Sequence, residues 1–173
     1  MKRAILFLSS ILLLACFSLA PVLAAGIPAH RVPVREWSTG SAGSTTGEVW
    51  TTPGGVIQTK GATITYPTYL EIDGATPLEG ISTNTFSQVR NTNEGILVVQ
   101  YDADWYYASE KGGFKGNVEA TVTGMTNPVT PPVMMNLHTV LHGYGSFEGQ
   151  ILMLSYEGKY SSKAIWTGTL LIP

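Results

Sequence analysis

Short runs of alternating apolar and polar residues fill the chain from residue 48 to its end. A period of two is typical of β-strands that bury one face. The runs are rich in Val, Ile, Thr, Tyr and Trp, and Gly, Pro and Asn separate them, as turns separate strands. No run of a dozen residues has a helical period. The pattern therefore predicts an all-β domain.

The strand expected at 95–107 shows the alternation most clearly, because all its odd positions are apolar. Four other strands, among them those at 62–72, 117–124 and 135–141, also separate into an inward and an outward face. Weaker strands are expected at 48–52, 55–60 and 81–90, and the strand at 151–154 is apolar on both faces. The residues expected to face the core are Leu97, Val99, Tyr101, Ala103, Trp105 and Tyr107; Val118, Ala120 and Val122; Met135, Leu137 and Leu141; Ala164, Trp166, Leu170 and Ile172; and Ile64, Tyr66, Leu70 and Ile72.

About eight strands joined by short turns predict one antiparallel β-barrel over 48–173, with a β-sandwich as the alternative. Closure into a barrel removes the unpaired strand edges that invite aggregation. Residues 25–47 are expected to form a flexible lead-in, since this range contains prolines and the polar stretch STGSAGSTTG.

The first 24 residues have the order of a secretory signal peptide. Lys2 and Arg3 precede a long apolar run, and small residues lead to an expected cleavage after Ala24. An uncleaved anchor and lipidation at Cys16 are the alternatives. The protein is therefore expected to be secreted or held in the cell envelope. Cleavage after Ala24 would remove Cys16, the only cysteine, and with it any disulfide chemistry.

Charge excludes one class of partner. Removing residues 1–24 leaves 149 of 173 residues, with eight Lys and Arg against twelve Asp and Glu, a net charge of −4. No basic run survives, so nucleic acid is not an expected partner. The pattern implies no cofactor or metal, and leaves the oligomeric state open.

The segment Gly143-Tyr144-Gly145-Ser146-Phe147-Glu148-Gly149 resembles a Gly-x-Gly-x-Phe-x-Gly motif of allene oxide cyclases and dirigent proteins. An earlier segment, Gly113-Phe114-Lys115-Gly116, has a similar pattern. Those families form eight-stranded antiparallel barrels, so the resemblance implies the same fold. It carries over no catalytic residue.

The candidate site residues cluster in one strand. Tyr101, Trp105 and Tyr107 are expected to line the core or a cavity, where they could contact an aromatic ligand or stack on a carbohydrate. Asp102 and Asp104 share the opposite face, about 7 Å apart, a spacing that could hold a calcium ion or form an acid–base pair. The alternative is that both carboxylates simply face solvent.

Two histidines, His138 and His142, lie roughly 13 Å apart along an expected strand, too far for one metal ion. His138 is a candidate ligand contact or general base. The alternative is that both histidines only line the polar face of the strand beside Asn136. The proline-rich loop at 127–132 could cover a barrel mouth or serve only as a connector.

Three functions remain open. The first is a barrel that binds a small apolar or aromatic ligand, which the inward Tyr, Trp, Met and Leu residues favour. The second is a packed surface or interaction protein without a cavity. The third is a cyclase-type enzyme, as the resemblance would imply, although no acid–base set can be assembled from the sequence.

Overall fold

The computed structural model describes residues 29–40, 43–125, 132–161 and 164–173. The expected signal peptide, with Cys16, lies outside these ranges, and so does most of the loop at 127–132. Residues 31–172 form one compact unit. None of the described residues forms a helix long and apolar enough to cross a membrane.

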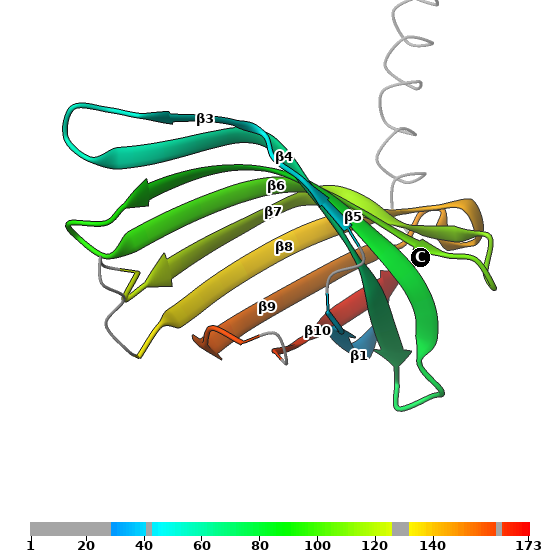
Figure 1. The fold of residues 1–173 in the computed structure, drawn as a ribbon. Coiled ribbons are helices and arrows are strands. Elements are labelled where there is room, and N and C mark those ends of the chain that lie inside the picture. Colours follow the sequence, from blue (N-terminus) through cyan, green and yellow to red (C-terminus); the bar gives the residue numbers. More distant parts are fainter. Residues whose placement is uncertain (1–28, 41–42, 126–131, 162–163) are drawn as a thin grey trace, which may run out of the picture. The chain divides into compact units, whose positions relative to one another are not determined.

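Strands make up nearly all of the described chain (Figure 1). A single turn of 3-10 helix, η1, covers Gly145–Phe147. The strands are β1 (His30–Ser38), β2 (Gly43–Thr45), β3 (Glu48–Thr51), β4 (Val56–Ile72), β5 (Leu78–Asn91), β6 (Ile96–Tyr107), β7 (Gly112–Thr123), β8 (Met134–Tyr144), β9 (Ile151–Lys159) and β10 (Ile165–Ile172).

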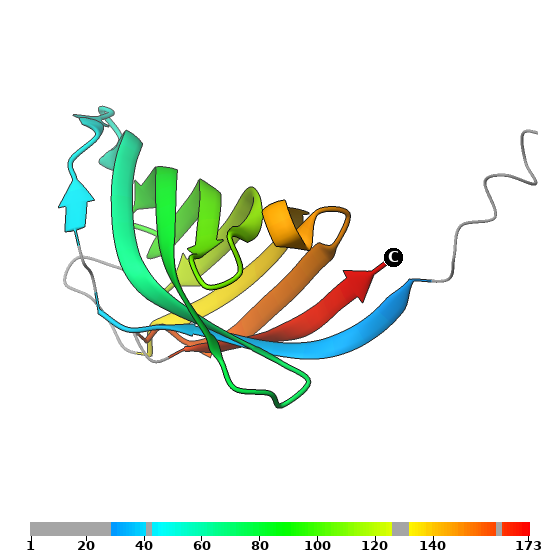
Figure 2. The ribbon, with the colours of Figure 1, turned by 90° about the vertical axis from the view of Figure 1, so that its right-hand side faces the viewer.

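Eight of these strands close into a barrel. From β4 to β10 each strand pairs antiparallel with the next, and β1 lies between β10 and β4, antiparallel to β4 (Figure 2). Six antiparallel steps lead from β4 to β10, so these two strands run in the same direction. Since β1 is antiparallel to β4, it is antiparallel to β10 as well. The predicted barrel is confirmed, and the β-sandwich alternative is wrong.

The first half of β4 projects beyond the barrel. There it pairs with the short strands β2 and β3, which are not part of the ring. The register between β4 and β5 shifts between Thr59 and Ala62, where Gly61 has a φ of +71°. Such a bulge bends a strand. The sequence prediction split this element into strands at 55–60 and 62–72, and the structure joins them.

The prediction of a flexible lead-in at 25–47 is wrong for β1. Val32, Val34 and Glu36 are buried and alternate with exposed neighbours, so this strand is an integral part of the barrel wall. Its outer face also packs, because the Trp37 ring stacks on Tyr69 of β4 at 5.6 Å. Pro33 and Glu36 interrupt the short alternation, so the sequence does not mark this strand clearly.

The predicted inward faces are confirmed in β6, β7, β8 and β10. Trp105, Tyr107, Val118, Leu141 and Leu170 are each at most 1% exposed. Tyr106 points outward and is 45% exposed. The pleat of each strand therefore separates core from surface as the sequence indicates.

Aromatic rings fill one end of the barrel. Phe147 of η1 lies 4.7 Å from Phe114 and 6.1 Å from Tyr107, measured between ring centroids. The backbone reaches this position because Gly145 takes a φ of +64°, and an added Cβ there would lie 2.4 Å from the Lys111 carbonyl oxygen. The resembling motif thus places its phenylalanine in the core at the closed end of the barrel.

Candidate functional site

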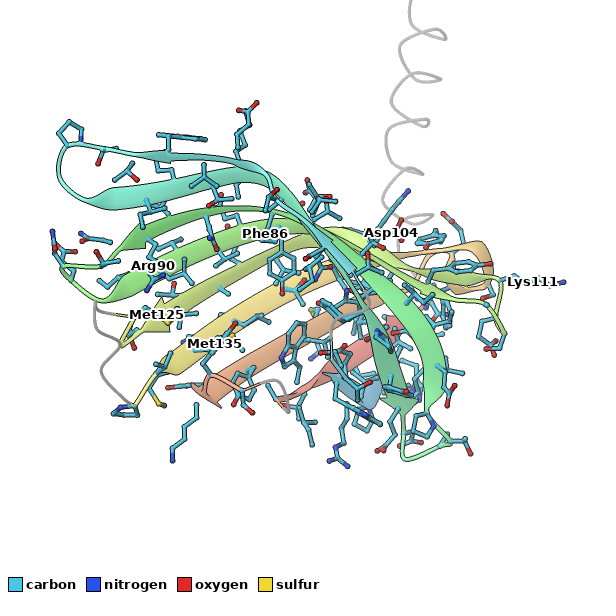
Figure 3. The ribbon with its side chains drawn as sticks, in the orientation of Figure 1. Phe86, Arg90, Asp104, Lys111, Met125 and Met135 are labelled. Carbon is cyan, nitrogen blue, oxygen red and sulfur yellow. The ribbon has the colours of Figure 1, made fainter. Side chains whose placement is uncertain are left out.

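The other half of the barrel contains a cavity of about 470 Å³. It lies inside the wall formed by β4 to β8 and β10, toward the β5–β6 turn and the β9–β10 connection. Figure 3 shows Phe86 and Met135 on the inside of this wall. The lining residues are Ser38, Gly40, Ile64, Tyr66, Asn84, Phe86, Gln88, Leu97, Val99, Tyr101, Ala120, Val122, Met135, Leu137, Tyr160, Ser161, Ala164 and Trp166.

Apolar side chains dominate the cavity wall. Leu97, Val122 and Met135 form a small buried cluster that is separate from the main core. At the inner end, Trp166 lines the cavity, and its ring lies 5.8 Å from the buried ring of Trp105. The cavity therefore ends where the aromatic packing of the closed half begins.

A chain of polar side chains crosses the cavity wall between β4 and β5. Ser82 Oγ donates to Asn84 Oδ1 at 3.1 Å, and Asn84 Nδ2 donates to the hydroxyl of Tyr66. Tyr66 and Asn84 both line the cavity, whereas Ser82 is fully buried. Such a satisfied network holds polar groups in fixed positions against an otherwise apolar wall.

Glu36 lies buried inside the barrel and is 1% exposed. Thr68 donates a hydrogen bond to its carboxylate. Burial raises the pKa of Glu36 from 4.5 to about 7, and the hydrogen bond from Thr68 opposes part of this rise. Glu36 does not line the cavity, yet its charge helps to raise the pKa of Tyr66 and Tyr101. It is thus a polar group behind the cavity wall.

Glu36, Tyr66 and Asn84 are site residues that the sequence does not predict. Glu36 falls in the predicted lead-in, although the alternation Val32, Val34, Glu36 marks it as inward-facing. Tyr66 was expected in the core, but Asn84 gave no signal, because its strand has polar residues on both faces.

The three candidate aromatics of β6 differ in their surroundings. Tyr101 lines the cavity, as the ligand hypothesis requires. Trp105 and Tyr107 are 0% exposed and belong to the packed core. The Tyr107 hydroxyl lies near enough to Thr68 for its pKa to be affected, but the geometry does not make a hydrogen bond.

Asp102, Asp104 and His138 lie on the outer face of the barrel (Figure 3 labels Asp104). Asp104 accepts a hydrogen bond of 2.7 Å from the Tyr144 hydroxyl, and the ammonium group of Lys115 lies 5.5 Å from the centre of the Tyr144 ring. Within the described ranges, no three His, Cys, Asp or Glu residues are arranged to hold a metal ion. Because Asp102, Asp104 and His138 lie on the outer face, the barrel wall separates them from the cavity.

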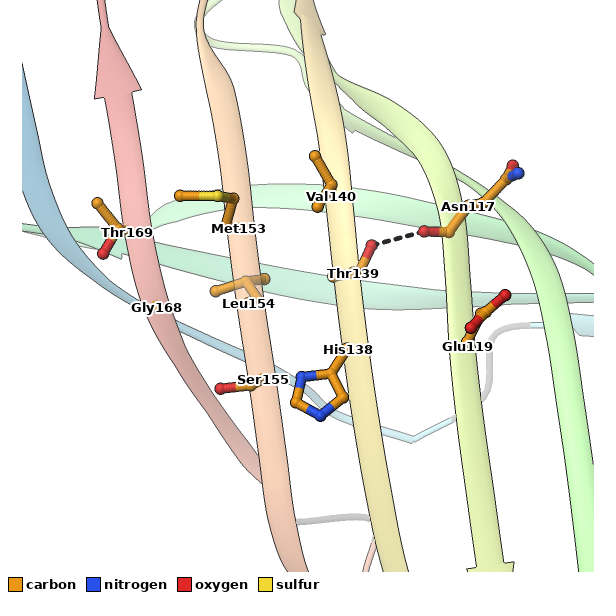
Figure 4. Close-up of a pocket in the computed structure, with 10 residues that line it drawn as sticks. All are labelled: Asn117, Glu119, His138, Thr139, Val140, Met153, Leu154, Ser155, Gly168 and Thr169. Carbon is orange, nitrogen blue, oxygen red and sulfur yellow. Dashed lines mark hydrogen bonds between the residues drawn. The ribbon is translucent and has the colours of Figure 1, made fainter. Parts of the chain in front are cut away.

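A second hollow, of about 580 Å³, lies on the outer face over β7 to β10 and includes Glu119 and His138 (Figure 4). It is larger than the cavity, but adjacent strands of a single sheet supply its lining. A ligand there would keep its other side in water, whereas binding sites bury most of a ligand's surface. The cavity inside the barrel is the better candidate site.

Comparison with family models, curated proteins and solved structures found no match for this chain. The resemblance to allene oxide cyclases and dirigent proteins therefore stays a prediction, and the function is argued from the site itself.

Proposed function

We propose that this protein binds a small apolar or aromatic molecule in the cavity of its barrel. The observation that carries the proposal is the cavity itself, about 470 Å³ of space surrounded by strands and lined mainly by apolar side chains. Ligand sites in proteins usually measure roughly 300–1,000 Å³ and combine such walls with a few fixed polar groups. An eight-stranded barrel is wide enough to hold one small ligand.

The two halves of the barrel support this proposal against a purely structural role. Phe114, Phe147 and Trp105 pack the closed half. In the other half, the inward positions include the small residues Ala120 and Ala164. Large side chains at those positions would fill the interior and stabilise the fold by burying more apolar area. The absence of large side chains at these two positions is expected if the cavity holds a ligand.

The proposal includes export. The order of charged, apolar and small residues in 1–24 supports a cleaved signal peptide, so the barrel would meet its ligand outside the cytoplasm.

Titration with N-phenyl-1-naphthylamine, a neutral probe that fluoresces in apolar surroundings, tests the binding proposal. We expect one saturable site. The substitution Ala120→Phe should fill the cavity and weaken probe binding about tenfold or more, a loss of about 1.4 kcal/mol. Thr121→Phe adds the same ring to the outer face of β7 and is the matched control, expected to leave binding unchanged.

Thermal unfolding of both variants checks that they remain folded. Binding that survives Ala120→Phe in a folded protein, or no saturable binding by the parent protein, would contradict the proposal.

A further inference from the structure

The hydroxyl of Tyr101 is a free donor in the cavity wall. Tyr101 lines the cavity, and within the described part of the chain its hydroxyl makes no hydrogen bond. Tyr101 is half-buried, and a phenol largely withdrawn from water usually finds a partner, because an unpaired polar group there costs free energy. A ligand atom in the cavity would supply the missing acceptor.

Tyr66 stands close to Tyr101 but is already engaged. Its oxygen accepts a hydrogen bond from Asn84, and the Ser82 hydroxyl also interacts with it. The two phenols are near enough for the charge of Tyr66 to raise the pKa of Tyr101. The cavity wall thus presents the Tyr101 hydroxyl as a donor without an acceptor among the described residues, beside a polar group that the fold holds in place.

The surroundings of Tyr101 disfavour an anion. The lining includes no Lys, Arg or His among the described residues. Burial raises the pKa of Tyr101 well above 10, with Tyr66 and Glu36 adding to the rise, so its proton is retained at neutral pH. The buried Glu36 would repel a second negative charge nearby. Arg90 faces the interior nearer the β5–β6 turn and does not line the cavity.

We infer that the ligand is a neutral molecule with an apolar body and one acceptor oxygen, a carbonyl or ether, that accepts a hydrogen bond from Tyr101. This inference rests on the proposed function and adds the chemical class of the ligand. One neutral hydrogen bond contributes about 0.5–1.5 kcal/mol net, which corresponds to a preference of roughly two- to tenfold.

Three naphthalene derivatives of nearly equal shape test the inference. They are 2-acetylnaphthalene, a neutral ketone; 2-isopropenylnaphthalene, in which CH2 replaces the carbonyl oxygen; and 2-naphthoate, an anion. Each is titrated at pH 7.5 by displacement of N-phenyl-1-naphthylamine. We expect the ketone to bind about fivefold more tightly than the alkene, after correction for their difference in transfer from water, and the naphthoate to bind most weakly.

The substitution Tyr101→Phe removes the donor while keeping the ring. It should reduce the preference for the ketone over the alkene to about twofold or less. Thermal unfolding checks that the variant remains folded. Tyr156→Phe is the matched control, since the Tyr156 hydroxyl donates to the Lys159 carbonyl at 2.6 Å and does not line the cavity.

The outcomes separate this inference from the proposed function. If the probe binds but ketone and alkene bind equally, or if Tyr101→Phe leaves the preference intact, the inference is wrong and the binding proposal stands. Tighter binding of naphthoate than of the ketone would also overturn it and would direct attention to Arg90. Failure of the probe to bind would refute the proposed function instead.

Discussion

Thr68 donates a hydrogen bond to the carboxylate of Glu36 across the line where β1 pairs with β4. The register places Glu36 opposite Leu70 and Thr68 opposite Ser38, so the bond runs diagonally between the two strands. Both side chains are at most 1% exposed. A group that ionises lies at the contact that closes the barrel. Among the described residues, Thr68 is the one hydrogen-bond donor that offsets the loss of water around its charge.

Replacing this carboxyl group should change how stability depends on pH. The pKa of Glu36 is about 7 in the folded chain against 4.5 when exposed, so the folded state binds the extra proton between these values. The protonated Glu36 carboxyl group therefore makes its full favourable contribution to the free energy of unfolding below pH 4.5. This contribution is lost as the pH rises to about 7. Glu36→Gln should be more stable than the parent at pH 8, by up to about 3 kcal/mol, and similar to it near pH 4.5.

Urea unfolding at pH 4.5, 6, 7 and 8 measures this difference. Glu79→Gln, on the exposed face of β5, is the control and should not change the pH profile. A parent protein that is the more stable of the two at pH 8 would show that the Glu36 charge is well compensated.

Truncation of Phe147 should weaken the closed end of the barrel. Its ring is 7% exposed and contacts Phe114 and Tyr107. Removing a buried phenylalanine side chain costs about 3 to 5 kcal/mol, so Phe147→Ala should lower the free energy of unfolding by that amount. Tyr106→Ala, which removes an exposed ring from β6, should change it by about 0.5 kcal/mol or less. Equal effects would contradict the packing described.

Gly168 should not tolerate a side chain. A Cβ added there would lie 1.8 Å from the Met153 carbonyl oxygen in the neighbouring strand. We expect Gly168→Ala to destabilise the barrel by at least about 1 to 3 kcal/mol in urea unfolding. Gly54→Ala places the same methyl group where no atom lies within 4 Å, and should be neutral or slightly stabilising. A neutral Gly168→Ala would mean that β9 and β10 are farther apart than described.

The acidic and histidine candidates of the sequence analysis should not affect binding in the cavity. Asp102, Asp104 and His138 are exposed on the outer face. Asp102→Asn, Asp104→Asn and His138→Asn should each leave the affinity for N-phenyl-1-naphthylamine within about twofold, a change of 0.4 kcal/mol. A larger loss in a folded variant would place part of the site on the outer surface.

The mass of the denatured protein from its native host tests the proposed processing. Cleavage after Ala24 predicts a chain that begins at Ala25. A lipid-modified chain beginning at Cys16, or an intact start at Met1, would contradict it.

Most of the barrel could be predicted because its inner and outer faces differ in polarity. In β6 the odd positions are apolar and the even positions include Gln100, Asp102 and Asp104, so the inward face follows from the pleat. β1 was missed because Pro33 and Glu36 interrupt a short run, and only its pairing with β4 and β10 gives these residues a strand environment.

The cavity site could be predicted only in part. Tyr101 was identified because it belongs to a dense aromatic cluster. The sequence does not distinguish it from Trp105 and Tyr107, since all three face inward on one strand. The three residues differ in their position along the barrel axis, which decides whether a side chain lies in the cavity or in the packed half. That position depends on the stagger of neighbouring strands. The polar chain of Ser82, Asn84 and Tyr66 likewise exists only once β4 and β5 are in register.

The position of β1 has a consequence for how the protein is made. This first strand of the ring pairs with β10, the last strand of the ring, so the barrel cannot close until β10 has been synthesised. Contacts between strands so distant in sequence form slowly, typically in milliseconds to seconds. A chain emerging from the ribosome would thus keep its barrel open until β10 has emerged. That delay fits the proposed export, in which the chain would cross a membrane unfolded and complete its fold on the other side.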